Sequence, residues 1–189
     1  MWLVNLTTGE RGVCYNLFMV QKLVILRGAP ASGKTTIAEK LRDFDSKIVW
    51  FKTDNFKQFF SNPSEDRILD EAMETCVATL NYLLDSGYSV VYEGIFQKAE
   101  YVQKAIEIAK AKNIPVVIYQ LSCSLKILQE RDKNRKGVKE GCRKPLGDEL
   151  IENLFNKLQS SSIPGTIKLD TGNTPLEECI EIIRKNFSN

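Results

Sequence analysis

Hydrophobic residues recur along this chain at two different spacings. Runs that are apolar at nearly every position predict strands buried on both faces, and they fall at 22–27, 47–51, 88–92, 114–121 and 166–169. Between them, apolar residues at intervals of three and four predict helices with one buried face, at 34–44, 64–84, 98–112, 124–135, 146–158 and 175–187. Strands separated by helices of this length pair in parallel through right-handed crossovers. The pattern predicts an α/β fold in three layers, α/β/α, with a five-stranded parallel sheet.

The length of 189 residues fits one domain. Residues 1–19 show neither spacing and lack the basic start of a signal peptide, so we expect an N-terminal extension, followed by a domain at 20–189. A net charge of +2 gives no support for a nucleic-acid or membrane partner. No apolar run is long enough to span a bilayer.

Cysteine and histidine usage restricts the chemistry. The five cysteines are scattered and no two have CxxC spacing, which argues against a disulfide framework or a zinc site and indicates a reducing, cytoplasmic location. The chain contains no histidine, which excludes Ser-His and Cys-His dyads and histidine-ligated metals. A general base must therefore be Asp, Glu, Lys or Tyr.

The first strand leads into Gly28-Ala-Pro-Ala-Ser-Gly-Lys-Thr35, which fits the phosphate-binding pattern G-x-x-x-x-G-K-[ST]. Its glycines let successive backbone N–H groups turn toward phosphate oxygens, and the following helix presents its positive end to the same anion. Lys34 adds a charge on the β- and γ-phosphates, and Thr35 offers a hydroxyl to Mg²⁺. We expect ATP to be bound by Gly28, Ala31, Ser32, Gly33, Lys34, Thr35 and Thr36.

Acidic residues follow the second and third strands, at the edge of the sheet where ligands bind in such folds. Asp54 is the candidate base that orients and deprotonates an acceptor hydroxyl, with a helix cap as the alternative. Glu93 is the candidate acid for Mg²⁺; it would equally serve the acceptor or lie in a solvated loop.

A basic segment follows the fourth strand. Arg131 and Arg135 are four residues apart and are expected on one helix face. We interpret residues 124–148 as a lid that closes over the nucleotide and brings guanidinium groups to the phosphoryl group in transfer. A solvated basic helix and a nucleic-acid contact surface remain alternatives. The last strand runs into 170–175, which would either contact the adenine base or be a turn before a helix capped by Thr174.

With these motifs the chain resembles the P-loop kinase group that includes polynucleotide 5′-kinases, zeta-toxin-like kinases, chloramphenicol phosphotransferase and gluconate kinase. The resemblance covers residues 22–187 and implies a P-loop NTPase fold. In that group the acid after the second strand is the usual base and the arginines form the lid. The resemblance thus implies these roles for Asp54, Arg131 and Arg135, with Lys34 completing the catalytic set.

Two positions depart from that group. Lys57 stands where several members have arginine, and Glu93 stands where many have aspartate. The leading hypothesis is an ATP- and Mg²⁺-dependent kinase that phosphorylates a hydroxyl of a small molecule or of a nucleic-acid 5′ end. The acceptor pocket is expected at 55–66 and 95–101. An ATP-hydrolysing switch and a non-catalytic nucleic-acid-binding module are the competing hypotheses.

Overall fold

The structure is a computed structural model, which describes residues 20–60, 66–135 and 144–187. Its single sheet has the order β2-β3-β1-β4-β5, and each neighbouring pair is parallel. The strands are β1 (Leu23–Gly28), β2 (Ile48–Lys52), β3 (Ser89–Gly94), β4 (Val116–Ser122) and β5 (Thr166–Asp170). The predicted α/β fold with five parallel strands is confirmed.

The helices lie close to the predicted positions, except that α2 was not among the predicted ranges. They are α1 (Lys34–Arg42), α2 (Thr53–Lys57), α3 (Asp66–Asp85), α4 (Ala99–Ala111), α5 (Leu125–Lys133), α6 (Asp148–Gln159) and α7 (Leu176–Arg184), with a 3₁₀ turn, η2, at Lys185–Phe187. The predicted start of α3 at residue 64 lies outside the described residues. No helix in the described ranges is both long and apolar enough to cross a membrane.

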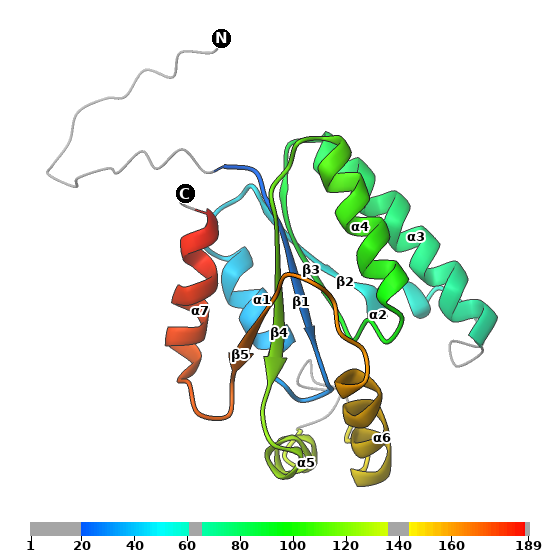
Figure 1. Ribbon diagram of the computed structural model, residues 1–189, viewed down its shortest axis with the longest axis vertical. Coiled ribbons are helices and arrows are strands. Elements are labelled where there is room, and N and C mark those ends of the chain that lie inside the picture. Colours follow the sequence, from blue (N-terminus) through cyan, green and yellow to red (C-terminus); the bar gives the residue numbers. More distant parts are fainter. Residues whose placement is uncertain (1–19, 61–65, 136–143, 188–189) are drawn as a thin grey trace, which may run out of the picture.

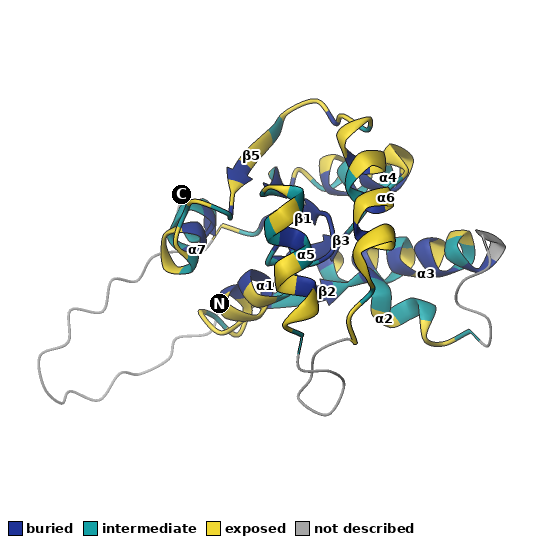
Figure 2. Ribbon diagram, turned by 90° about the horizontal axis from the view of Figure 1, so that it is seen from below, coloured by how far each residue is buried: buried dark blue, intermediate teal, exposed yellow. Residues whose placement is uncertain are grey.

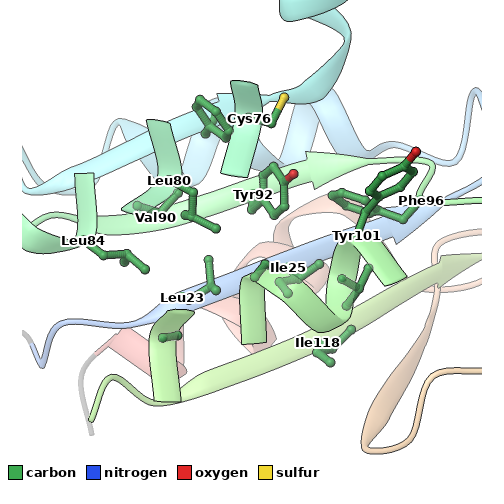
Figure 3. Close-up of a cluster of buried hydrophobic side chains, with 14 of the residues drawn as sticks. Leu23, Ile25, Cys76, Leu80, Leu84, Val90, Tyr92, Phe96, Tyr101 and Ile118 are labelled. Atoms are coloured by element: carbon green, nitrogen blue, oxygen red, sulfur yellow. The ribbon is translucent and has the colours of Figure 1, made fainter. Parts of the chain in front are cut away.

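Two helical layers cover the sheet, as Figure 1 shows. On one face, α3 and α4 pack against alternate residues of β1 and β3, such as Leu23, Ile25 and Tyr92 (Figure 3). On the other face, α1 and α7 pack against the intervening residues, such as Val24 and Leu26. Because successive side chains of a strand point to opposite faces, a central strand buried on both sides is apolar at most positions; the buried charged residues Arg27 and Glu93 lie near the carboxyl ends of β1 and β3.

Burial differs between the centre and the edges of the sheet (Figure 2). Every residue of β1 and β3 is buried, whereas in the edge strand β5 only Leu169 is buried. An edge strand is covered less completely by the helical layers, which explains why 166–169 carries the weakest apolar pattern of the five strands.

Helices α5 and α6 lie beyond the carboxyl ends of the strands (Figure 1). A small apolar cluster joins them to the first loop: Leu128 of α5 and Ile151 of α6 pack with Ala29. Asp132 also ties the two helices together, because its Oδ2 accepts the backbone N–H groups of Leu146 and Gly147 at 2.7 and 3.1 Å. The ends of the expected lid are thus held on the phosphate loop, and residues 136–143 between them lie outside the described residues.

Candidate active site

A cavity of about 730 Å³ lies at the carboxyl edge of the sheet. Its walls are the loop after β1, the ends of β2 and β3, the end of α5 and the turn after β5. In parallel α/β sheets this edge is where ligands bind. The predicted residues that line it are Ala31, Gly33, Lys34, Thr35, Thr36, Asp54, Glu93, Arg131 and Arg135.

The loop between β1 and α1 depends on two glycines for different reasons. Gly33 has a φ of 93°, a left-handed conformation that favours glycine, and it is the N-cap of α1. A Cβ on Gly28 would lie 2.6 Å from Ser32 Oγ and 2.7 Å from the backbone oxygen of Leu121, closer than real contacts allow. Gly28 and Ser32 do not line the cavity, so in this structure they shape the loop from behind.

Lys34 points back along the loop from the first turn of α1. Its Nζ donates to the backbone oxygens of Gly28 and Ala29 at 2.9 and 2.8 Å. Burial of the ammonium lowers the pKa of Lys34 to about 8, although Glu93 and Asp54 oppose this shift. A polyanion in the cavity would stabilise the charged form of the ammonium.

Glu93 is fully inside β3 rather than after it, and it is 2% exposed. Its Oε1 accepts the Thr35 hydroxyl at 2.6 Å and its Oε2 accepts Trp50 Nε1 at 2.8 Å. Of the alternatives for Glu93, the solvated loop is therefore wrong. The Thr35 hydroxyl and the Glu93 carboxylate are the hard oxygen donors that Mg²⁺ prefers, and Mg²⁺ commonly takes few protein ligands beside substrate phosphates. Among the described residues, no group of three or more His, Cys, Asp or Glu side chains could hold a metal ion.

Asp54 lies in the first turn of α2, whose N-cap is Lys52, so its alternative role as a helix cap is not what the structure shows. Its side chain is 19% exposed, and its Oδ1 lies 3.4 Å from Lys57 Nζ. Asp54 lines the main cavity and also a small adjoining recess of about 30 Å³ between α2, α3 and α4. The carboxylate of Asp54 is therefore accessible from both cavities.

The small recess is built only partly from the expected acceptor region at 55–66 and 95–101. Phe96, Gln97 and Tyr101 come from that region, whereas Leu69 and Met73 of α3 lie outside it. Of the aromatic residues in the expected region, Phe96 lines this recess and is 5% exposed, whereas Phe59 is 74% exposed.

The two arginines approach the cavity in different ways. Helix α5 ends at Lys133, so the expectation that Arg131 and Arg135 share a helix face is wrong. Beyond the C-cap Asn134, Arg135 Nε lies 3.1 Å from Oδ1 of the buried Asp132, whose Oδ2 holds the backbone just before α6. Both arginines nevertheless line the cavity.

Thr171 connects the elements on this side of the cavity through its hydrogen bonds, a role that the sequence did not predict. Its backbone oxygen and its Oγ1 accept from Arg131 at 2.7 and 3.4 Å, and its own Oγ1 lies 3.0 Å from the backbone oxygen of Ser32. Thr171 therefore joins the phosphate loop to Arg131. The turn that begins at Thr171 lines the cavity, and α7 begins at Leu176 with Pro175 as N-cap, so Thr174 is not the cap.

Comparisons with known proteins agree with this geometry. No curated protein matches the chain with significant similarity. Among solved structures, a sugar kinase from a Janibacter species shares 20% identity with a TM-score of 0.67, over 87% of this chain and 93% of that one. A gluconokinase from Sinorhizobium meliloti shares 18% identity with a TM-score of 0.65, over 89% and 93%. A chain of the Pnkp1/Rnl/Hen1 RNA repair complex shares 20% identity with a TM-score of 0.60, over 78% of this chain and 47% of that one.

At this level of identity those structures establish only the fold, whereas a match to a sequence family also assigns the chain to a group of related proteins. The family profile described as Zeta toxin matches residues 18–162. That segment contains the phosphate loop, Asp54, Glu93 and both arginines. The family match and the kinase fold together support an ATP-dependent phosphotransferase of the P-loop kinase group. Because the matched segment is more than half of the chain, the protein belongs to the Zeta toxin family.

Proposed function

We propose that this protein transfers the γ-phosphate of ATP to a hydroxyl group of an acceptor. The observation that carries the proposal is the position of Asp54, on the wall shared by the phosphate cavity and the recess between α2, α3 and α4. The recess holds only about 30 Å³, so in this proposal it receives one edge of an acceptor whose remainder lies in the mouth of the main cavity; a protein that only hydrolysed ATP would need no such acceptor beside its base.

In the proposed reaction, the acceptor hydroxyl lies against the Asp54 carboxylate and attacks the γ-phosphorus. The new bond joins the acceptor oxygen to phosphorus, the bond from phosphorus to the β–γ bridging oxygen breaks, and ADP leaves. The hydroxyl proton passes to the carboxylate of Asp54. Phosphoryl transfer needs positioning and charge neutralisation more than covalent chemistry, which fits a site made of a carboxylate and several cations.

Thr35 and Glu93 are the residues that would hold Mg²⁺, directly or through water, because their oxygens are 2.6 Å apart at the cavity wall. When bound, the ion neutralises phosphate charge and fixes the phosphate geometry. Trp50 positions this pair by donating to the second carboxylate oxygen at 2.8 Å.

Lys34, Arg131 and Arg135 supply the remaining positive charge. The ammonium of Lys34 is buried, so its field acts at low dielectric on the β- and γ-phosphates. The arginines belong to the segment 124–148 that we propose as the lid, and they face the cavity from the side opposite Asp54 and Glu93. The turn after β5, with Asn173 and Leu176, is the proposed contact for the nucleotide base.

The proposed acceptor site is the recess of Leu69, Met73, Phe96, Gln97 and Tyr101 together with the mouth of the main cavity. The named neighbours are a sugar kinase, a gluconokinase and a component of an RNA repair complex. We therefore place the acceptor among small hydroxyl compounds and nucleic-acid 5′ ends, with nucleic acid as substrate only. The three cysteines within the described residues are free thiols, which agrees with a cytoplasmic location.

The test is transfer of labelled γ-phosphate from ATP with Mg²⁺ to separate pools of sugars, nucleosides and 5′-hydroxyl oligonucleotides. With the acceptor so identified, Asp54→Asn should lower kcat by at least about a hundred-fold and leave the Kd for ATP within about three-fold of the wild type. Asp43→Asn, which alters an exposed aspartate paired with Arg42, is the matched control and should change neither value. Full transfer by Asp54→Asn would contradict the assigned base.

The competing function is an ATP-hydrolysing switch. It predicts steady ADP release with every pool of acceptors omitted, and equal ADP release when any pool is present. A kinase instead shows slow ADP release alone and a large stimulation by its acceptor. The ratio of the two rates therefore separates the functions before the acceptor is chemically identified.

A further inference from the structure

Lys52, the last residue of β2, is a cation in the phosphate cavity to which no role has been given. In the register of the sheet, Lys52 pairs with Glu93 of β3, and Trp50 lies two residues earlier on the same side of the strand. Lys52 Nζ lies 5.9 Å from the centre of the Trp50 ring, and the side chain lines the cavity. The strand therefore delivers an ammonium to the end of the sheet where phosphates are expected.

The hydrogen bond made by Lys52 is the informative contact. Its Nζ donates to Thr35 Oγ1 at 3.3 Å, while the hydroxyl proton of Thr35 is donated to Glu93 Oε1 at 2.6 Å. Lys52 thus approaches a lone pair of the oxygen that would coordinate Mg²⁺. Glu93 does not neutralise the ammonium by contact: its oxygens accept from Thr35 and Trp50, and within the described ranges no ion pair joins it to Lys52.

The surrounding charges do not favour a purely structural ion pair either. The charged residues that line the cavity are Lys34, Lys52, Arg131 and Arg135 against Asp54 and Glu93, so positive charge is in excess, and Lys52 is among the charges that oppose protonation of Lys34. Placing several cations close together costs free energy unless a polyanion joins them. The phosphates of ATP are the anion for which the rest of the cavity is built.

We propose that Lys52 is a phosphate-binding residue that contacts the phosphate oxygens beside the metal position and shares with Mg²⁺ the oxygen of Thr35. Part of the charge that Mg²⁺ neutralises in a metal-dependent site is then neutralised here by the protein. The consequence is appreciable binding of metal-free ATP. The inference rests on the ATP binding of the proposed function and not on the acceptor or the base.

The test measures ATP affinity by calorimetry, once in EDTA and once with saturating Mg²⁺, for wild type and Lys52→Met. If Lys52 makes a charged hydrogen bond to phosphate, Lys52→Met should lower the affinity for metal-free ATP by at least about ten-fold. With Mg²⁺ on the same oxygens, the loss should be no more than about three-fold. By thermodynamic linkage, Mg²⁺ must then bind the ATP complex of Lys52→Met about three-fold more tightly than that of the wild type.

Two further variants make the result specific. Lys52→Arg keeps the charge and should stay within about three-fold of the wild type in EDTA. Lys47→Met removes an exposed lysine just before the same strand and should change neither affinity. The proposal would be overturned if Lys52→Met bound ATP in EDTA as tightly as the wild type, or if its ATP affinity fell by the same factor with and without Mg²⁺. A wild type that bound ATP well but phosphorylated no acceptor would count against the kinase reaction and leave this result intact.

Discussion

Replacement of Thr171 by valine tests whether one buried hydroxyl joins the phosphate loop to the lid. Two backbone oxygens are within reach of its proton, those of Ser32 at 3.0 Å and Ser122 at 3.3 Å. The oxygen of Ser122 already accepts the backbone N–H of Thr171 at 2.8 Å, and the oxygen of Ser32 is the nearer of the two. We therefore assign the hydrogen bond of the Thr171 hydroxyl to the Ser32 oxygen. Valine has nearly the same shape and removes only this hydrogen bond and the weaker one from Arg131.

The magnitude follows from what valine leaves behind. Ser32 is 1% exposed, and a buried carbonyl that loses its partner costs about 1–3 kcal/mol. Arg131 keeps its shorter bond to the Thr171 backbone oxygen, at 2.7 Å, so its guanidinium stays in place. We therefore expect Thr171→Val to lower the free energy of unfolding by about 1–2 kcal/mol, a fall in Tm of roughly 3–6 °C for a chain of this size.

The assay is urea denaturation without nucleotide, with thermal melting as a second measurement. Thr171→Ser keeps the hydroxyl and should recover more than half of the loss. Thr75→Val is the control, because the exposed Thr75 hydroxyl bonds only to Glu71 of its own helix, and it should cost less than about 0.5 kcal/mol. The reasoning is refuted if Thr171→Val unfolds like the wild type, or if Thr171→Ser is as unstable as Thr171→Val.

Three further predictions concern the loop, its lysine and the metal ligand. Gly28→Ala should abolish ATP binding and destabilise the fold by about 1–3 kcal/mol. The reason is that the new Cβ would overlap the backbone oxygen of Leu121. ATP binding by a folded Gly28→Ala protein would show instead that the strands can separate at low cost. Lys34 has a pKa of about 8 in the free protein, below its usual 10.5, so above pH 8 it must take up a proton to bind ATP. ATP affinity, measured by calorimetry, should then fall by up to about ten-fold per pH unit from pH 8 upward. The Lys34→Arg variant, measured over the same pH range, should not show this fall. Glu93→Gln keeps an acceptor for Thr35 but removes the charge, so the Mg²⁺ concentration for half-maximal turnover should rise by at least about ten-fold; an unchanged Mg²⁺ dependence would assign Glu93 to the acceptor instead.

Much of the fold is readable from the sequence because burial and spacing are local properties. The runs that became β1 and β3 are buried at every residue, as a central parallel strand requires. Helix ends were less readable, since they depend on contacts made from elsewhere. α5 ends at Lys133 with Asn134 as its C-cap, and just before that end the buried carboxylate of Asp132 is bonded to Leu146 and Gly147, more than ten residues further along the chain. Nothing in the local pattern distinguishes Asp132 from an exposed helix acid.

The site divides in the same way, between residues that a motif marks and residues that the strand order brings together. The phosphate loop is one continuous segment, so its pattern identifies Lys34 and Thr35 directly. Trp50 and Lys52 carry no motif; they reach Glu93 and Thr35 only because β3 lies between β2 and β1, an order that alternating strands and helices do not reveal. The charge balance around the phosphates, and with it the dependence on Mg²⁺, therefore has to be read from the neighbouring strands and not from the loop.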